Sequence, residues 1–353
     1  MHFTVVGAGA IGGTIGAHLA RAGHDVVFVD SVAEHVEAIA RDGLLIEGAE
    51  EFRVRVPAVT PAGLGHALGG RAPEAVLLSV KAQHTAGALE PVVPFLGPDS
   101  YVVSMQNGLN ERVIAARIGQ AKTIGAFVNF GADYQAPGRV MYASAGALYL
   151  GELDGRMTPR LERLGTIMRE SFLTNTTLTP NIWGYLWGKL GYASQLFATA
   201  TVDETMAAVL GVPENTALLA NLAGEVVRTA GAEGVRSEGF DGYEPGPMRF
   251  TSPRDWAGIR ASLDRLTAFN RGSLKQKSGI WRDLAVRHRR TEVDQQLGPI
   301  VEIARGHGFR LPLNERLIEM IHDLETGRRT MVPENLAELR RLSQAAYPEE
   351  VFP

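Results

Sequence analysis

The sequence of 353 residues predicts an α/β fold in which an N-terminal, doubly wound parallel sheet is followed by an all-helical C-terminal domain. Three observations support this prediction. Short, valine-rich apolar runs alternate with helical stretches in the first half, a glycine-rich turn joins the first run to the first helical stretch, and the pattern becomes continuously helical after about residue 157. We expect domains at residues 1–179 and 180–353.

The apolar runs of the first half have the composition of strands that are buried on both faces. Because a helical pattern at residues 11–22 separates the first two runs, the order strand–helix–strand predicts that they pair in parallel. The predicted strands comprise residues 3–6, 26–29, 75–79 and 101–105, followed by residues 123–129, 139–142 and 147–151, which complete the sheet.

After residue 157 apolar residues recur at helical spacing. The predicted helices comprise residues 160–170, 182–199, 202–210, 215–233, 257–276, 283–305 and 317–326. Between them, residues 237–253 are rich in glycine, proline and charge, which predicts a long loop. Two interpretations of this loop stay open: a disordered surface segment, or a lid over a binding site.

Composition and charge exclude several functions. The net charge of −4 argues against binding to nucleic acid or to an anionic membrane. The absence of cysteine excludes disulfides, thiolate metal sites and a cysteine nucleophile. No signal peptide and no membrane-spanning apolar stretch is recognisable, so we expect a cytoplasmic protein. We also predict no metal, because no metal-ligand spacing relates His18, His84, His288, His307 and His322.

The glycine-rich turn has the sequence Gly7-Ala8-Gly9-Ala10-Ile11-Gly12, which fits the pattern G-x-G-x-x-G. It follows a predicted strand and opens a predicted helix, the context in which this pattern binds a dinucleotide in a Rossmann domain. The first glycine allows the tight turn, the second lets the pyrophosphate approach the backbone, and the third lets helix and strand pack closely. The helix N-terminus attracts the phosphates. We therefore predict cofactor contacts from Gly7, Gly9, Ala10, Ile11 and Gly12.

Asp30 ends the second predicted strand, 18 residues after Gly12. A carboxylate at this place accepts hydrogen bonds from the adenosine ribose and repels the 2′-phosphate of NADP. Residues 25–40 contain no arginine or lysine that would neutralise such a phosphate. Asp30 therefore favours NAD over NADP; the alternative is an aspartate that only stabilises a turn or caps a helix.

Six motifs, spread along the chain in the right order, resemble those of the ketopantoate reductase (2-dehydropantoate 2-reductase) family. The resemblance covers most of the chain except residues 235–272, a segment that is longer than we expect for this family. The motifs are the loop of residues 7–12, Ser79-Val80-Lys81-Ala82, Gln106-Asn107-Gly108, Trp187-Gly188-Lys189-Leu190, Arg290-Thr291-Glu292-Val293-Asp294 and Gly308-Phe309-Arg310-Leu311-Pro312-Leu313-Asn314.

The resemblance implies roles for particular residues. Lys189 would be the general acid, and Glu292 a carboxylate on the substrate side. Asn107 would contact both cofactor and substrate. Lys81 would lie near the cofactor, where its family counterpart can help to hold a 2′-phosphate, so NADP stays possible. Ser278 matches the first of two family serines and would contact substrate, although it could equally be a loop serine. The resemblance also implies a homodimer.

The residues around Lys189 support its role independently. On a helix at residues 182–199, five apolar side chains form one stripe, and Lys189 lies at its edge. Burial lowers the pKa of a lysine, which makes the amine a usable proton donor near neutral pH. The alternative is a lysine whose stem packs while its amine reaches water. For Glu292 the alternative is a first-turn glutamate that the helix dipole favours.

We therefore expect an NAD(P)-dependent enzyme that interconverts a small 2-oxo acid and its hydroxy acid. The alternatives are an authentic 2-dehydropantoate 2-reductase, a 3-hydroxy acid or opine-type dehydrogenase, and an NAD-sensing protein without catalysis. Family members tend to carry asparagines four and eight residues after the lysine, where this chain has Ala193 and Phe197. Unless Ser194 or Gln195 replaces them, ketopantoate should be a poor substrate, and the preferred one larger or less polar.

Overall fold

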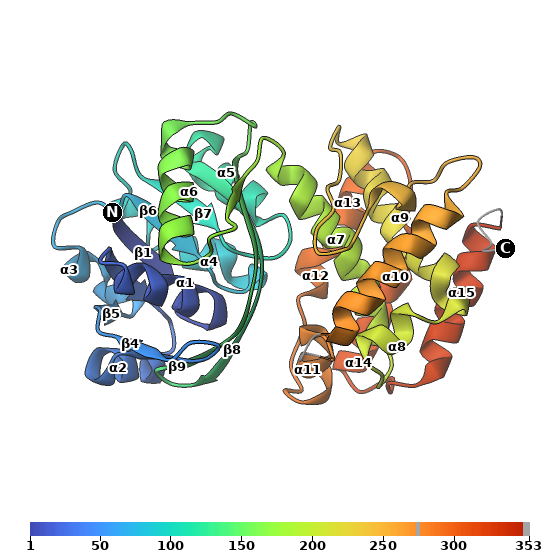
Figure 1. Ribbon diagram of the computed structural model, residues 1–353, viewed down its shortest axis with the longest axis horizontal. Coiled ribbons are helices and arrows are strands. Elements are labelled where there is room, and N and C mark those ends of the chain that lie inside the picture. Colours follow the sequence, from blue (N-terminus) through green and yellow to red (C-terminus); the bar gives the residue numbers. More distant parts are fainter. Residues whose placement is uncertain (273–275, 349–353) are drawn as a thin grey trace. The chain divides into compact units, whose positions relative to one another are not determined.

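The computed structural model describes residues 1–272 and 276–348. The chain forms two compact units, Met1–Ile182 and Trp183–Pro353. Figure 1 labels the helices and strands of both units.

The described part of the first unit is built on a ten-stranded sheet with the order β4-β3-β9-β8-β7-β6-β1-β2-β5, in which β10 pairs with β9. The central strands β7, β6, β1 and β2 all run parallel. The strands are β1 (His2–Val6), β2 (Asp25–Val29), β3 (Leu44–Gly48), β4 (Phe52–Val54), β5 (Ala58–Val59), β6 (Ala75–Leu78), β7 (Tyr101–Ser104), β8 (Thr123–Ala136), β9 (Arg139–Glu152) and β10 (Thr177–Leu178).

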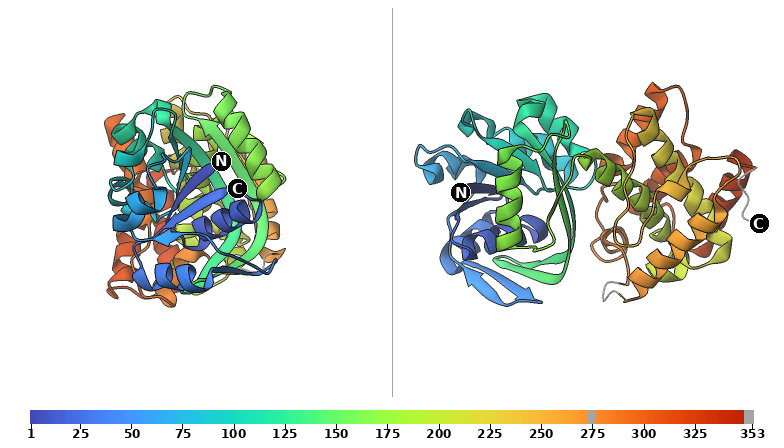
Figure 2. Two further views of the ribbon diagram at one scale, coloured as in Figure 1. Left: turned by 90° about the vertical axis from the view of Figure 1, so that its left-hand side faces the viewer. Right: turned by 45° about the horizontal axis from the view of Figure 1, so that its top comes forward.

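Helices cover both faces of this sheet, as Figure 2 shows. Alternate side chains of the central strands enter two separate apolar cores: Val5 packs on one face and Val6 on the other. The first core lies under α1 (Ala10–Arg21), α2 (Ala33–Asp42) and α6 (Pro159–Ser171). The second lies under α3 (Leu64–Leu68), α4 (Thr85–Leu89) and α5 (Asn110–Ile118). The prediction of a doubly wound sheet is therefore confirmed.

The end of the sheet differs from the prediction. Residues 139–142 and 147–151 form one strand, β9, and β8 extends to Ala136, so that the two make a long antiparallel hairpin. The backbones approach so closely at Gly146 that a Cβ there would lie 1.7 Å from the Asn129 carbonyl oxygen. Glycine therefore allows this close approach within one strand, where the prediction had two.

The second unit is helical in its described residues, and none of the described helices is long and apolar enough to span a bilayer. Its helices are α7 (Ile182–Thr199, which begins in the first unit), α8 (Met206–Leu210), α9 (Thr216–Ala232), α10 (Trp256–Gly272), α11 (Gly279–Ala285), α12 (Val293–Gln296), α13 (Gly298–Gly306), α14 (Pro312–Glu325) and α15 (Pro333–Ala346).

Three helix predictions need correction. The predicted helix 283–305 is divided among α11, α12 and α13, because His288 has a φ of 46° and Pro299 lies in the first turn of α13, where it cannot extend a preceding helix. The predicted helix 202–210 begins only at α8, where the Thr205 hydroxyl accepts a hydrogen bond from the Ala208 N–H. The predicted helix 257–276 ends with α10, and residues 273–275 lie outside the described residues.

The loop of residues 237–253 packs tightly onto the helices. Tyr243 and Met248 are completely buried, and Phe240 pairs with Tyr243 through two backbone hydrogen bonds. The Tyr243 hydroxyl lies against Gly191 of α7, where a Cβ would come within 2.5 Å of it. The interpretation as a disordered surface segment is therefore wrong, while the lid stays a prediction.

Candidate active site

The glycine-rich turn connects β1 to α1 at the carboxyl edge of the parallel strands. Gly7 has a φ of +91°, and its N–H donates to the carbonyl oxygen of Val29 (2.8 Å). A Cβ on Gly7 would lie 2.9 Å from the backbone nitrogen of Val80, and one on Gly12 only 2.0 Å from the Gly7 carbonyl oxygen. Both positions therefore require glycine, for conformation at Gly7 and for close packing at Gly12.

Gly9 differs from these two glycines because the space over it is open. A Cβ at Gly9 would meet nothing within 4 Å. Gly9 is also the N-cap of α1, and no side chain caps the helix, so the first N–H groups, at Ala10 and Ile11, keep their hydrogen-bonding capacity. An open glycine before an uncapped helix N-terminus fits the pyrophosphate of a dinucleotide.

The Asp30 carboxylate ties the glycine-rich turn to the next crossover. Its Oδ2 accepts a hydrogen bond from the Ala8 N–H (2.8 Å), and its Oδ1 accepts one from the Val32 N–H (2.9 Å). Asp30 therefore does stabilise a turn, as one interpretation held. A carboxylate has about four lone-pair positions, so these two bonds leave capacity for ribose hydroxyls.

The structure adds His35, which the sequence analysis did not single out. This buried side chain receives the Gly138 N–H at Nδ1 (3.0 Å), so its proton resides on Nε2, which donates to the Ala8 carbonyl oxygen (2.9 Å). The Ala8 peptide unit is thus held from both sides, by Asp30 and by His35. The available sequence signal was helical spacing, because His35 shares the buried face of α2 with Ala38 and Ile39.

Lys81 and Asn107 follow β6 and β7, so their backbones lie at the same sheet edge as the glycine-rich turn. The Gln106 side chain joins these two segments by donating to the carbonyl oxygen of Val80 (2.8 Å). Asn107 is exposed, and its carbonyl oxygen accepts from the Asn110 side chain (2.6 Å). The structure therefore brings the predicted cofactor residues of the first unit together along one edge.

In the second unit, Lys189 is half-buried on α7. Trp187, two residues before the lysine, and Leu190, directly after it, are buried. Ala193 and Phe197 are buried further along the helix. Phe197 is 0% exposed, so its ring is part of the helical core. The expected apolar stripe is therefore present.

The polar neighbours Ser194 and Gln195 are also buried on α7, but both are engaged inside the unit. The Ser194 hydroxyl donates to the Gly191 carbonyl oxygen (2.8 Å), and the Gln195 amide donates to the Leu219 carbonyl oxygen (3.0 Å). The Ser194 bond disfavours the alternative in which Ser194 replaces an asparagine of the family pattern. The buried Gln195 Oε1 has no hydrogen-bond partner among the described residues, so Gln195 stays a candidate for that role.

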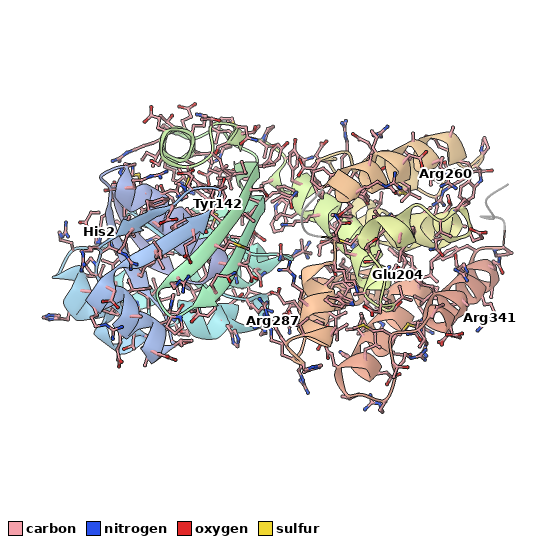
Figure 3. All side chains as sticks on the ribbon, turned by 60° about the horizontal axis from the view of Figure 1, so that its bottom comes forward. His2, Tyr142, Glu204, Arg260, Arg287 and Arg341 are labelled. Carbon is pink, nitrogen blue, oxygen red and sulfur yellow. The ribbon has the colours of Figure 1, made fainter. Side chains whose placement is uncertain are left out.

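Glu292 and Ser278 take different positions at helix N-termini. Glu292 is the half-buried N-cap residue of α12, but its carboxylate does not cap the helix. The Ser278 hydroxyl does cap α11, because it accepts from the Trp281 N–H (3.1 Å), and Ser278 is buried. Nearby, Arg287 and Arg289 bind the buried carboxylate of Asp283 (Figure 3 labels Arg287).

Two buried carboxyl groups lie outside these residues. Burial raises the pKa of Glu111, in the first turn of α5, to about 8. Neither of its oxygens has a partner of normal hydrogen-bond geometry among the described residues. Contacts with Ser104 and the Ala126 backbone therefore offset only part of the rise in pKa that burial causes. Burial also raises the pKa of Glu225, on α9, to about 7. Sequence alone gave no signal for either.

Comparison with known proteins identifies the family. The family described as ketopantoate reductase PanE/ApbA matches residues 3–155, and its C-terminal counterpart matches residues 181–325. A 2-dehydropantoate 2-reductase of Pyrococcus abyssi is 30% identical over 325 residues, which cover 92% of this chain and 98% of that protein.

Two solved structures share the fold. A PanE/ApbA family ketopantoate reductase from Ralstonia eutropha JMP134 has a TM-score of 0.76 at 24% identity, over 93% of this chain and 99% of that one. D-mandelate dehydrogenase with NADH and anilino(oxo)acetate has a TM-score of 0.78 at 21% identity, over the same shares of the two chains. Since the family matches extend over most of both units, the chain belongs to the ketopantoate reductase PanE/ApbA family and is an oxidoreductase that acts on a CH–OH group.

Proposed function

We propose that the protein is a nicotinamide-dependent enzyme that interconverts a 2-oxo acid and its 2-hydroxy acid, with Lys189 as general acid and base. The observation that carries this proposal is the family match in both units, which includes the glycine-rich turn and the α7 lysine. The open space over Gly9, together with the uncapped start of α1, supports dinucleotide binding.

A bound nicotinamide supplies the hydride chemistry that side chains cannot perform. Lys189 would donate a proton to the substrate oxygen during reduction and accept one from the hydroxyl during oxidation. Its positive charge would stabilise the negative charge that develops on that oxygen. Glu292 and Asn107 would orient the substrate and the lysine. Lys81 would lie beside the cofactor.

The preferred cofactor in this proposal is NAD(H). The Asp30 carboxylate is fixed beside the glycine-rich turn by its bond to the Ala8 N–H. Burial raises the pKa of the Tyr134 hydroxyl, and the negative charges of Glu34 and Asp30 raise it further, so the Tyr134 hydroxyl lies within electrostatic range of both carboxylates. Two negative charges there would repel a 2′-phosphate.

The preferred substrate in this proposal is not ketopantoate. Ala193 and Phe197 offer no side-chain hydrogen bond, the Ser194 hydroxyl donates to the Gly191 carbonyl oxygen, and the Gln195 amide nitrogen donates to the Leu219 carbonyl oxygen. A substrate that needs two polar partners would lose them here. The D-mandelate dehydrogenase of the same fold, whose complex holds anilino(oxo)acetate, is consistent with an aryl-substituted acid. The names of the curated relatives favour the second candidate, an authentic 2-dehydropantoate 2-reductase.

A steady-state screen separates these candidates. Purified protein is assayed with NADH and with NADPH against ketopantoate and against 2-oxo acids that carry alkyl, aryl and hydroxylated chains. The reverse reaction is assayed with the corresponding hydroxy acids and the oxidised cofactors. We expect the highest kcat/KM with NADH and an alkyl or aryl 2-oxo acid. Ketopantoate as the best substrate would establish the second candidate, and cofactor binding without any turnover would refute both.

A further inference from the structure

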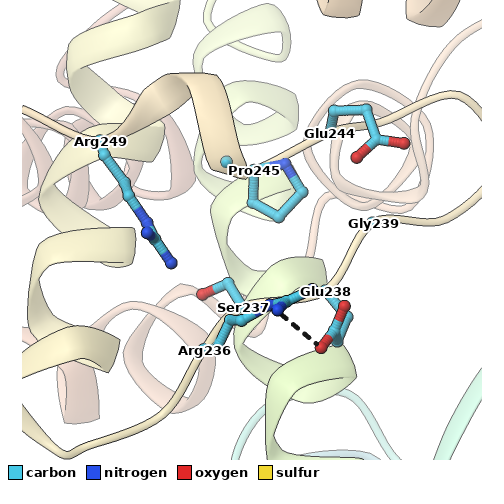
Figure 4. A pocket seen from close by; sticks show the side chains of 8 residues that line it. Arg236, Ser237, Glu238, Gly239, Glu244, Pro245 and Arg249 are labelled. Atoms are coloured by element: carbon cyan, nitrogen blue, oxygen red, sulfur yellow. Dashed lines mark ion pairs between the residues drawn. The ribbon is translucent and has the colours of Figure 1, made fainter.

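Two cavities adjoin each other in the helical unit, and neither is lined by Lys189, Ser278 or Glu292. Their volumes are about 300 and 470 Å³, and they share Ser237 and Arg249 (Figure 4 shows the smaller one). The long loop after α9 lines both, and α9 itself contributes Val227, Arg228 and Gly231 to the larger one. This loop belongs to residues 235–272, the segment that is longer than we expect for the family. Glu238 of the smaller cavity packs against Gly188, next to Lys189, whereas the lining of the larger cavity includes no residue with a role in the proposed reaction.

The two cavities differ in charge. Glu238 and Glu244 line the smaller one, where Glu238 pairs with Arg236 (3.6 Å). No carboxylate lines the larger cavity, whose two charged residues, Arg228 and Arg249, are both positive. The remaining lining residues are small or apolar apart from one hydroxyl, and they are Val227, Gly231, Val235, Ser237 and Phe250. The larger cavity therefore combines positive charge with an apolar wall.

The arginines of the larger cavity are available for a ligand. Neither Arg228 nor Arg249 forms an ion pair with a carboxylate of the described residues. Arg228 lies over the Phe309 ring (4.2 Å), which fixes its guanidinium without neutralising it. Arg254, which is buried, lies 4.5 Å from the centre of the Phe250 ring and adds a third positive charge near the apolar wall.

Ser237 supplies a second, independent sign of a ligand. The residue is only 9% exposed, and its Oγ has no hydrogen-bond partner among the described residues. In Figure 4 the Ser237 hydroxyl and the Arg249 guanidinium point toward one another. A buried hydroxyl without a partner is unfavourable unless something else binds it. An anionic oxygen placed between the two groups would accept from both.

We propose that the larger cavity is a second binding site, for a small carboxylate that carries an apolar group. Two guanidinium groups and a hydroxyl would bind the carboxylate, and the apolar wall would cover the rest of the molecule. Organic acids of this class resemble the proposed substrates and products, so the site would respond to their concentration without taking part in turnover. The carboxylate is bound by Arg228, Arg249 and Ser237, and the apolar group by Val227, Val235 and Phe250.

The test uses phenylacetate, which lacks a group that the enzyme can reduce or oxidise. Binding to the NADH-loaded full-length protein is measured by calorimetry, for the wild type and for Arg249→Gln, Arg228→Gln and Ser237→Ala. We expect saturable binding that each arginine variant weakens about tenfold, the loss of one charge-assisted contact. Phenylacetamide, which has no charge, should not bind. The control Arg341→Gln removes another exposed arginine, on α15 (Figure 3), and should change nothing.

The variant Lys189→Ala distinguishes binding at the proposed second site from binding at the catalytic site. Phenylacetate binding should persist in this variant. Binding that is lost in Lys189→Ala but unchanged in Arg249→Gln and Arg228→Gln would place the ligand at the catalytic site and overturn the proposal. Equal competition by inorganic phosphate would show a non-selective anion site and would overturn the ligand class. Thermal unfolding confirms that each variant is folded. None of these outcomes depends on turnover, so failure of the proposed function would not mimic them.

Discussion

The two units hold their candidate functional residues in different ways. In the first unit the candidate site is largely backbone: the Ala8 peptide is held by Asp30 on one side and His35 on the other, and Gly7 and Gly12 allow the close approach. In the second unit the proposed proton transfer belongs to one side chain, Lys189, on a mostly buried helix. Substitutions in the first unit should therefore act on cofactor affinity, and substitutions at Lys189 on the rate of the chemical step.

The two buried carboxyl groups, Glu111 of the first unit and Glu225 of the second, also differ in how their surroundings hold them. Glu225 accepts hydrogen bonds from the N–H groups of Leu313 and Asn314, from the Asn314 side chain and from the Tyr347 hydroxyl. Glu111 has no comparable set of partners among the described residues. Hydrogen-bond donors around a buried carboxyl partly stabilise its charged form. A buried carboxyl without such donors favours its neutral form. The two carboxyls should therefore respond differently to the same substitution.

The largest expected effect is that of Lys189→Ala. Loss of a positioned general acid should lower kcat by roughly two to four orders of magnitude. The Kd for the cofactor should hardly change, because the cofactor residues lie in the first unit. Steady-state kinetics and a fluorescence titration with NADH measure the two quantities. Near-normal turnover in a folded variant would remove the proposed mechanism.

The next effect concerns stability and pH. The pKa of Glu111 is raised from 4.5 to about 8, so its contribution to stability is present in acid and is lost as pH rises between these values. Glu111→Gln cannot ionise, and above pH ~8 it should be more stable than the wild type by a few kcal/mol, on the order that such a pKa difference implies.

Glu225→Gln is the matched comparison. Its amide group would face N–H donors that the Glu225 carboxyl oxygens now satisfy, so below pH ~7, where the raised pKa keeps Glu225 largely un-ionised, this variant should be less stable than the wild type by ~1–3 kcal/mol. Denaturant unfolding across a pH series measures both variants. Below pH ~7 Glu111→Gln should be close to the wild type in stability and Glu225→Gln clearly less stable; an equal loss in both variants there would show that the contrast between the two carboxyls is wrong.

A smaller effect is expected for His35→Leu. The substitution removes the donor to the Ala8 carbonyl oxygen and the acceptor of the Gly138 N–H, which should cost ~1–3 kcal/mol of stability and weaken NADH binding several-fold. His35→Gln keeps a donor and should recover part of the affinity. The control His66→Leu changes an exposed histidine of α3. A loss of stability without any change in the Kd for NADH would show that His35 only supports the fold.

The smallest effect is a change of cofactor preference. Asp30→Ala combined with Ser31→Arg should move the kcat/KM ratio toward NADPH by about tenfold, since the change removes a repulsive charge and adds a phosphate partner. Steady-state assays with both cofactors measure it. A wild type that already prefers NADPH would mean that Lys81 or a distant arginine outweighs Asp30.

The sequence by itself determined the features that depend on neighbouring residues. The glycine-rich turn, the parallel strands on either side of it and the helix that carries Lys189 all follow from local conformation and from the spacing of apolar residues. Asp30 could be placed at the end of β2 for the same reason.

The tertiary structure decided what depends on residues that are far apart in the chain. The His35 ring meets the Gly138 N–H across 103 residues, and no local pattern announces that bond. The long loop after α9 is composed like a surface segment, yet it becomes ordered because Tyr243 packs against α7. The hairpin of β8 and β9 continues past its small residues because the two strands pair on both sides of a register shift, at Asn129 with Ala147 and at Gly131 with Ser144. In each case the deciding energy is burial or hydrogen bonding between distant segments, which composition and spacing do not encode.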